Sequence, residues 1–378
     1  MAEVQKAPRD ATWDIARGLG MALVIYGHLL EPMYPAKADI GKPFLESAFV
    51  QWQTIYSFHM MLFFLVSGAV NRSLPRKSWR DVLLGSLRLL ALAWIVHIIG
   101  VVFAVACGFS PDGRKSIAAF AEALFEPIAL GFLWSVGVLW FLTSLCFVQI
   151  LAYAILRYTQ SILLVPLTMI ATAASPYLPN YYLMKTWMPA LSFFILGFLV
   201  SKWQLRVPSW LWIALVPATI LLAPLNTGCT FTLSQACYNV GPGLFGVWMF
   251  AGVYGFLPLF FLSAAVGSFA VVSLSVALAK LLPFTGFLAY MGRKSLDLFI
   301  INGFVATFLA TTIAQIVWPA LTVLDYLGLF ILAVGAHLIA LQILSPVLAW
   351  FDAAAMAISS FIVRLVAGSS GGMEAKAT

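Results

Sequence analysis

Long apolar runs recur along the whole chain, and they constrain its fold more than any other feature. Runs of roughly 18 or more apolar residues can cross a bilayer as helices, whereas a transmembrane β-barrel shows short alternating strands. Of the 378 residues, 62% are hydrophobic and only 9% are charged, whereas soluble domains carry about 25% charged residues. The sequence therefore predicts an all-α polytopic membrane protein and excludes soluble, disordered and collagen-like classes.

Ten of these runs are candidate membrane spans, and they divide the chain into three expected parts. A cytoplasmic N-terminal segment at 1–12, without a cleavable signal peptide, precedes a transmembrane domain at 13–350. The cytoplasmic tail at 351–378 is expected to hold a short amphipathic surface helix at 351–366 and a disordered end. The run at 244–279 is too long for one crossing, so part of it should lie outside the membrane. The ten runs are 13–33, 50–70, 82–107, 133–156, 161–178, 186–201, 209–224, 244–279, 295–317 and 323–348.

The basic residues predict how the chain is oriented in the membrane. The formal net charge is +7, but the basic residues lie in short loops between apolar runs, which favours membrane orientation over nucleic-acid binding. With the N-terminus inside, 16 Lys and Arg residues lie at inner ends and loops, and 5 lie in outer loops. The positive-inside rule then predicts an even number of spans and two cytoplasmic termini.

The four cysteines do not indicate a metal site. Cys107 and Cys146 fall within apolar runs, where a thiol usually packs. Cys229 and Cys237 share one outer loop, and the sequence leaves open whether they form a disulfide. No Cys/His spacing typical of metal binding occurs, and there is no Walker A or dinucleotide-binding loop.

The first span carries the densest set of ionisable residues, and such residues are costly within a membrane. Asp14 lies three residues before Arg17, close enough for a side-chain pair. His28 follows Arg17 by eleven residues, about three helical turns and a rise of roughly 16 Å. Asp14, Arg17 and His28 are therefore predicted to form one stripe from the cytoplasmic end to beyond mid-membrane, which makes them candidates for function.

The second span and the following loop add further candidates. His59 lies in the outer half of the second span, near the predicted depth of His28, and two neutral imidazoles that share a cavity suit general acid–base catalysis. The loop residues Arg72, Arg76, Lys77 and Arg80 lie near the inner end of the first span. Such a basic cluster suits a phosphorylated ligand at the inner mouth.

Structural roles are the alternatives for several of these residues. His97 and His337 are better interpreted as packing residues. The basic loop equally well serves only to anchor the chain on the cytoplasmic side. Asp14 and Arg17 are candidates for a structural ion pair, whereas His28 favours function because it shares a face with two charged groups.

These residues together resemble the integral-membrane acyltransferase-3 family. In the first span, the family has a basic residue, ten intervening residues and a histidine, as at Arg17 and His28, with Asp14 at its preceding Asp. The family's later run L-W-F-L is matched by residues 139–142. The second-span run F-H-x-P-L-F-F-x-x-S-G is matched by Phe58, His59, Leu62, Phe63, Phe64, Ser67 and Gly68, with Met61 replacing Pro.

The family's G-R-x-S-L-x-I-Y-x-x-H run also has a counterpart, in which Asn302 stands where the family has its terminal His. The other matching positions of that run are Gly292, Arg293, Ser295, Leu296, Leu298 and Phe299. The resemblance covers most of the chain.

The resemblance implies an O-acyltransferase of the bacterial inner membrane, with acetyl-CoA as the cytoplasmic donor. The acceptor would be a hydroxyl of a glycan or glycolipid at the outer face. Some members carry an extra hydrolase-like domain; none follows in this sequence, so the chain is expected to act alone or with a separate partner. His28 would be the general base or acyl-transfer centre. The implied supporting residues are Arg17, Asp14 and His59 at the reaction centre, Arg72 and Arg76 at the CoA phosphates, and Trp140 and Ser67 along the cavity.

Two alternatives remain open at this stage. The chain is compatible with a transporter of a sugar-linked lipid or an anion, with the first-span stripe lining the path. It is also compatible with an acyltransferase for another acceptor, such as a glucan, an amino sugar or a lipid, or with a different fold centred on His337. The sequence does not specify the acceptor, the acyl group or the oligomeric state.

Overall fold

The chain forms a bundle of helices with one small strand pair, as the computed structural model describes it. The helices are α1 (Ala11–Leu30), α2 (Glu46–Tyr56), α3 (His59–Val70), α4 (Trp79–Ala106), α6 (Trp140–Leu156), α7 (Leu164–Ala171), α8 (Met184–Lys202), α9 (Trp212–Leu222), α10 (Leu257–Ala279), α11 (Gly286–Arg293), α12 (Ser295–Phe304) and α14 (Val323–Gly368). The described residues are 11–33, 46–106, 121–122, 124–125, 128, 131, 133, 135–179, 181–226, 239–241, 244–281, 285–310, 312 and 322–368.

Short elements complete the described chain. A π-helix, η7 (Val305–Leu309), directly follows α12, and strands β1 (Asn239–Gly241) and β2 (Leu244–Phe245) pair antiparallel. The 3-10 helices are η1 (Leu74–Arg76), η2 (Thr172–Tyr177), η3 (Tyr181–Leu183), η4 (Ala223–Leu225) and η6 (Met249–Ala251). Because β1 and β2 are so short, the fold is helical, as the sequence predicted.

Within the described ranges, five helical stretches are long and apolar enough to cross a membrane. They are Glu46–Val70, Trp79–Ala106, Tyr181–Lys202, Leu257–Ala279 and Val323–Val366. Four shorter apolar helices lie at Trp140–Leu156, Leu164–Ser175, Trp212–Leu225 and Ser295–Leu309. A membrane protein is thus supported, while the count of ten spans and the cytoplasmic location of both termini stay predictions.

The helix α1 is the element on which the candidate site is built, and it packs against α2, α3, α10, α11, α12 and α14. Where α1 crosses α11, the two backbones are so close that no side chain fits between them at the point of contact. A Cβ at Gly18 would clash with the carbonyl oxygen of Leu288, and a Cβ at Gly292 would clash with that of Asp14. Small residues let helix backbones touch within membranes, so Gly292 serves close packing beside the N-terminal end of α1.

A second close crossing joins α3 to α8. A Cβ at Gly68 would clash with the carbonyl oxygen of Phe194, and a Cβ at Gly197 would clash with that of Leu65. The fully buried side chains of Phe64, Phe193, Phe194 and Phe198 belong to the same two helices and form part of the core. Gly68, like Gly292, therefore has a packing role in the motif that contains it.

Several predicted spans differ from the observed helices. The second span is broken at Ser57 and Phe58, between α2 and α3. Only the later part of the 244–279 run is a long helix, α10, because Gly252 and Gly255 have positive φ angles of 71° and 67° and turn the chain before it. The structure also contains a short helix, α11, in a segment for which the sequence predicted no helix.

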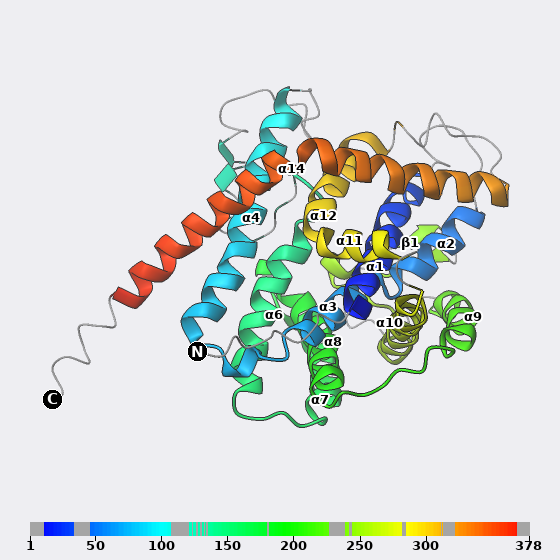
Figure 1. Ribbon diagram of the computed structural model, residues 1–378, viewed down its shortest axis with the longest axis horizontal. Coiled ribbons are helices and arrows are strands. Elements are labelled where there is room, and N and C mark those ends of the chain that lie inside the picture. Colours follow the sequence, from blue (N-terminus) through cyan, green and yellow to red (C-terminus); the bar gives the residue numbers. More distant parts are fainter. Residues whose placement is uncertain are drawn as a thin grey trace.

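The last helix, α14, is longer than the predicted final span. Residues 351–366, expected to form a separate surface helix, continue α14 without interruption. Pro346 lies inside the helix, and a proline there bends a helix without necessarily ending it. Figure 1 shows the bend: the first half of α14 runs beside α11 and α12, and the second half reaches α4. An ion pair between Arg88 and Asp352 joins α4 to α14.

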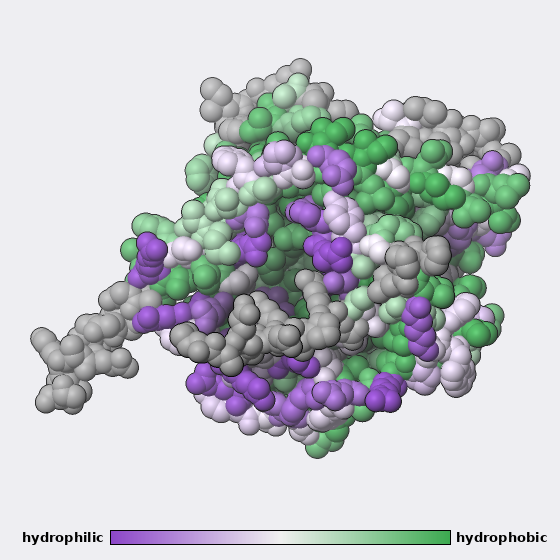
Figure 2. Space-filling view, viewed as in Figure 1, coloured by the Kyte–Doolittle hydropathy of each residue, from purple (hydrophilic) through white to green (hydrophobic). Residues whose placement is uncertain are grey.

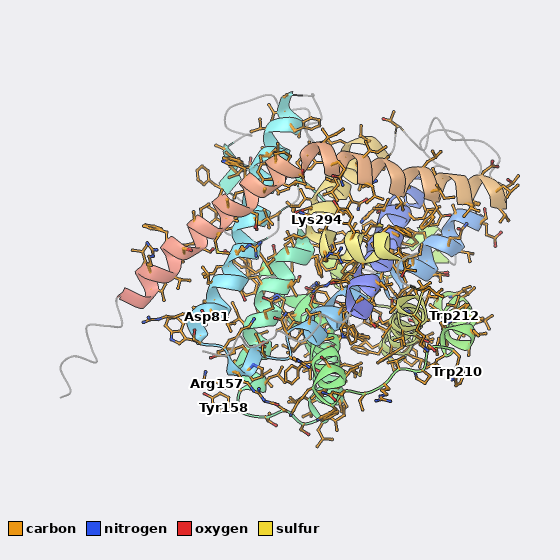
Figure 3. The ribbon with its side chains drawn as sticks, in the orientation of Figure 1. Asp81, Arg157, Tyr158, Trp210, Trp212 and Lys294 are labelled. Atoms are coloured by element: carbon orange, nitrogen blue, oxygen red, sulfur yellow. The ribbon has the colours of Figure 1, made fainter. Side chains whose placement is uncertain are left out.

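Polar residues gather on one side of the view. Figure 2 shows hydrophobic residues over much of the surface and hydrophilic residues along its lower part and in a central band. In Figure 3, Asp81, Arg157, Tyr158, Trp210 and Trp212 lie along that lower part. All five belong to loops or span ends that the sequence predicts to be cytoplasmic. These predicted cytoplasmic segments therefore lie on one side of the molecule.

The junction between α11 and α12 is held by a local ion pair. Lys294 Nζ donates a hydrogen bond to Asp297 Oδ2 at 3.0 Å (Figure 3 labels Lys294). This hydrogen bond and the attraction of the carboxylate raise the pKa of Lys294 above its ordinary value. The pair lies at the start of α12, next to the C-terminal end of α11.

Candidate active site

A cavity of about 1150 Å³ lies between the ends of α1, α3, α8 and α10. Four of its lining residues are basic and one is acidic: Arg17, Arg72, Arg206, Lys280 and Asp14. The excess of positive charge, with two or more guanidinium groups, suits a phosphorylated anion. The structure thus brings Asp14, Arg17 and Arg72 to one site, as their sequence pattern suggested.

Arg72 is positioned by the end of α3. The backbone N–H of Asn71 donates to the carbonyl oxygen of Gly68 at 3.1 Å, and Asn71 Nδ2 donates to the carbonyl oxygen of Ser67 at 2.9 Å. These bonds satisfy carbonyl groups that a helix end leaves free. The chain therefore leaves α3 in a defined direction, and the next residue, Arg72, faces the cavity.

Arg206 is positioned by a tight turn at the end of α8. The N–H of Leu205 donates to the carbonyl oxygen of Val200 at 3.0 Å, and that of Gln204 donates to Ser201 at 3.2 Å. This is a Schellman motif, in which the residue after the cap adopts the left-handed conformation. Gln204 does so with φ of 51°. The turn directs Arg206 back toward the cavity.

The segment that follows this turn is tied to the end of α10. Lys280 Nζ donates a hydrogen bond to Ser209 Oγ at 2.9 Å. Lys280 follows the last residue of α10 and lines the cavity with Ser209. Basic groups from three separate parts of the chain thus converge on α1, although sequence analysis had not singled out Arg206 or Lys280.

A second polar cluster lies at the other end of α1. His28 Nδ1 is 3.2 Å from Glu31 Oε2 and 3.0 Å from the hydroxyl of Tyr56, and that hydroxyl donates to Glu31 Oε2 at 2.8 Å. The His28 and Glu31 side chains are 21% and 31% exposed. Since α1 rises about 1.5 Å per residue, this cluster is roughly 16 Å along the helix from Arg17.

The hydrogen bonds of this cluster define the tautomer of His28. The single hydroxyl hydrogen of Tyr56 is used toward Glu31, and an ionised carboxylate only accepts hydrogen bonds. His28 Nδ1 must therefore carry the hydrogen in its contacts with Glu31 and Tyr56. Nε2 of a neutral His28 is then the basic nitrogen, as in catalytic triads where a carboxylate orients the base.

The ring of Tyr56 lies close to the rings of both His28 and His59. The ring of Tyr56 lies 5.9 Å from that of His28 and 4.7 Å from that of His59. His59 is buried, and its Nδ1 donates to the carbonyl oxygen of Ile55 at 2.8 Å. This bond satisfies a carbonyl group at the break between α2 and α3, so His59 contributes to the local structure beside the His28 cluster.

Other predicted site residues lie apart from the cavity. Arg76 belongs to η1, and neither it nor Ser67 or Trp140 lines the inner cavity. Ser67 is buried next to the close crossing of α3 with α8. Trp140 begins α6 and has an edge-to-face contact with Phe141, at 6.4 Å between ring centroids. Cys229 and Cys237 lie outside the described residues.

The two remaining histidines differ in their surroundings. His97 is fully buried and forms two contacts with the Ser135 hydroxyl, at 2.7 Å from Nδ1 and 2.9 Å from the carbonyl oxygen. His337 is buried too, and its Nδ1 donates to the carbonyl oxygen of Ala333 at 2.8 Å. Among the described residues, no group of three or more His, Cys, Asp or Glu side chains is arranged to hold a metal ion.

Sequence reasoning missed Glu31 and Tyr56 as members of the outer cluster. The signal for Glu31 was available, since residues three apart on a helix are neighbours and Glu31 follows His28 by three. Tyr56 had no such signal, because its position depends on how α2 packs against α1.

A family model described as an acyltransferase domain matches residues 10–342, which is most of the chain. The match includes both clusters on α1 and all of α3, α8, α10 and α12. No match to a curated protein or to a solved structure was found.

Proposed function

The chain belongs to the acyltransferase-3 family, and on this basis we propose that it is an O-acyltransferase that uses cytoplasmic acetyl-CoA. The acceptor in this proposal is a hydroxyl of a glycan or glycolipid at the outer face of the bacterial inner membrane. The observation that carries the proposal is the placement of a cationic cavity and an oriented histidine at opposite ends of the same helix, α1.

The inner cavity is the proposed donor site. Arg17, Arg72, Arg206 and Lys280 would hold the phosphate groups of the CoA nucleotide, since guanidinium and ammonium groups bind phosphate through charge-assisted hydrogen bonds. Asp14 would keep Arg17 in position. Arg76, which sequence reasoning assigned to the phosphates, does not line the cavity, so we assign it no direct contact.

The chemistry is proposed to occur at His28. The acceptor hydroxyl oxygen attacks the thioester carbonyl carbon, and His28 Nε2 takes the hydroxyl proton as the new C–O bond forms. The C–S bond then breaks, and the proton passes from His28 to the leaving CoA thiolate. No other reactant is needed, because the thioester and the hydroxyl become an ester and a thiol.

Glu31 and Tyr56 are positioning residues in this mechanism. Their contacts with Nδ1 hold the His28 ring and keep its hydrogen on Nδ1. Glu31 also balances the positive charge that His28 gains when it takes the proton. His59 would support Tyr56 through their ring contact and is a secondary member of the site. Ser67 and Trp140 are not assigned a donor contact.

Membrane vesicles that contain the protein or its His28→Ala variant, matched for folded amount, test this proposal. Acetyl-labelled acetyl-CoA is supplied, and both free CoA and the label in the glycan and lipid fractions are measured. We expect the variant to lose both signals. If the intact protein releases no more CoA and transfers no more label than empty vesicles, the acetyl-CoA proposal is wrong, and transport assays should follow.

A further inference from the structure

The neighbouring helices α12 and α14 carry two buried side chains in which a hydrogen-bonding atom has no partner among the described residues. They are Asn302 on α12, at Nδ2, and His337 on α14, at Nε2. The residues are 1% and 4% exposed. Buried polar atoms in native proteins nearly always have a partner, so each unpaired atom requires an explanation. A bound ligand that completes the hydrogen bonds is one such explanation.

The two atoms have opposite hydrogen-bonding character. His337 Nδ1 donates to the carbonyl oxygen of Ala333 at 2.8 Å, so the hydrogen of the neutral ring is on Nδ1. Nε2 is then an acceptor. Asn302 Nδ2 belongs to an amide NH₂ group and is a donor. A ligand group that satisfies both atoms must itself carry an acceptor and a donor, which a secondary amide does.

Contacts of α14 place His337 between the two ends of α1. Toward the outer end, Phe330 packs edge-to-face against Tyr26, with 5.5 Å between ring centroids. Toward the inner end, Gln342 Nε2 donates to the hydroxyl of Tyr290 on α11 at 2.8 Å. His337 lies between these two contacts along α14.

Asn302 lies at an intermediate depth as well. The helix α12 begins directly after α11, whose Gly292 touches the backbone of Asp14 at the inner end of α1. Asn302 is seven residues after Ser295, the first residue of α12, which is about two turns along that helix. The helix α12 packs against both α1 and α14. The unpaired donor and the unpaired acceptor are thus both located beyond the donor cavity in the direction of His28.

We propose that Asn302 and His337 bind the amide groups of the donor's pantetheine arm as it extends from the cavity to His28. This inference rests on the proposed function. The arm joins the CoA phosphates to the sulfur and contains two secondary amides, each with a carbonyl acceptor and an N–H donor. Arg17 and His28 are roughly 16 Å apart along α1, so the arm must cross the protein between them.

The physical need for such partners is strong. An amide that enters an apolar interior loses its hydrogen bonds to water, and this loss opposes binding unless the protein replaces them. Asn302 Nδ2 would donate to an amide carbonyl oxygen of the arm, and His337 Nε2 would accept from an amide N–H. The same two contacts would remove the unpaired state of both protein atoms.

The test compares two ligands that differ by the arm and one phosphate group. Purified full-length protein in lipid nanodiscs is titrated with CoA and with adenosine 3′,5′-bisphosphate, which lacks the arm and the phosphate group that carries it. We expect Asn302→Leu and His337→Leu to bind CoA about tenfold more weakly, which is about 1.4 kcal/mol. Their affinity for the bisphosphate should equal that of the unmodified protein.

Three further variants keep the test informative. His337→Gln should retain CoA affinity, because the Gln side-chain amide can supply an acceptor near the position of Nε2. Ser268→Ala is the matched control: its buried Oγ on α10 is likewise unpaired among the described residues, and we expect both affinities to stay unchanged. Asn302→Ser removes the Nδ2 donor if the Leu variant does not fold.

The outcomes separate this inference from the proposed function. If the unmodified protein binds neither ligand, the donor site itself is wrong, and the inference falls with it. If the protein binds CoA but the Asn302 and His337 variants bind it equally well, only the inference is overturned, and an acceptor-binding role would be tested next. Equal weakening of both ligands would also overturn it, since the loss would not depend on the arm.

Discussion

Replacing Glu31 with Gln tests whether the outer cluster on α1 orients a catalytic base. The substitution keeps the shape of the side chain but removes the carboxylate that contacts His28 Nδ1 at 3.2 Å and accepts the Tyr56 hydroxyl at 2.8 Å. An amide NH₂ facing Nδ1 would favour the ring form with its hydrogen on Nε2, and Nε2 then cannot take the hydroxyl proton. We therefore expect the chemical step to slow.

The size of the effect follows from the geometry. A hydrogen bond to a charged group contributes about 1.5–3 kcal/mol. The two side chains are 21% and 31% exposed, and solvent screening favours the lower end of that range. A loss of about 1.5 kcal/mol in the transition state corresponds to roughly a tenfold lower kcat. The KM for acetyl-CoA should not change, because the proposed donor cavity is at the opposite end of α1.

The assay is the initial rate of CoA release from membrane vesicles over a range of acetyl-CoA concentrations. Glu46→Gln is the matched control, since Glu46 is an exposed carboxylate in the first turn of α2. We expect its kinetics to equal those of the unmodified protein. An unchanged kcat in Glu31→Gln, or a raised KM with normal kcat, would refute the proposed positioning role.

Three further substitutions test the cavity and the packing. Arg206→Ala should raise the KM for acetyl-CoA about tenfold at constant kcat, because the proposed phosphate contact is lost. The control, Arg76→Ala, should leave the KM unchanged. Equal effects of the two substitutions on KM would contradict the assignment of the cavity as the donor site. Gly292→Ala should destabilise the protein by about 1–3 kcal/mol, because its Cβ would clash with the carbonyl oxygen of Asp14; an unchanged melting temperature would show that α11 is not closely packed. Gln204→Gly should stabilise it by about 1 kcal/mol, because glycine adopts φ of 51° without strain; a lowered melting temperature would contradict the described turn.

The helical membrane class and the candidate residues on α1 were predictable from the sequence. Apolar content over a window of about 20 residues is a local property, so it predicts helices at α4, α8 and α10 without knowledge of their partners. The spacing of Asp14, Arg17 and His28 is likewise local, because helical periodicity determines which residues of one helix share a face.

Only the tertiary structure decided which residues from different helices meet. Arg206 and Lys280 reach the cavity because a Schellman turn reverses the chain after α8 and because α10 ends at the same wall. Tyr56 reaches His28 because α2 ends before α3 begins and packs beside α1. Asn302 and His337 are left with unpaired atoms by the packing of α12 and α14. Such contacts depend on shape and close backbone approach between distant segments, and residue spacing within one segment carries no information about them.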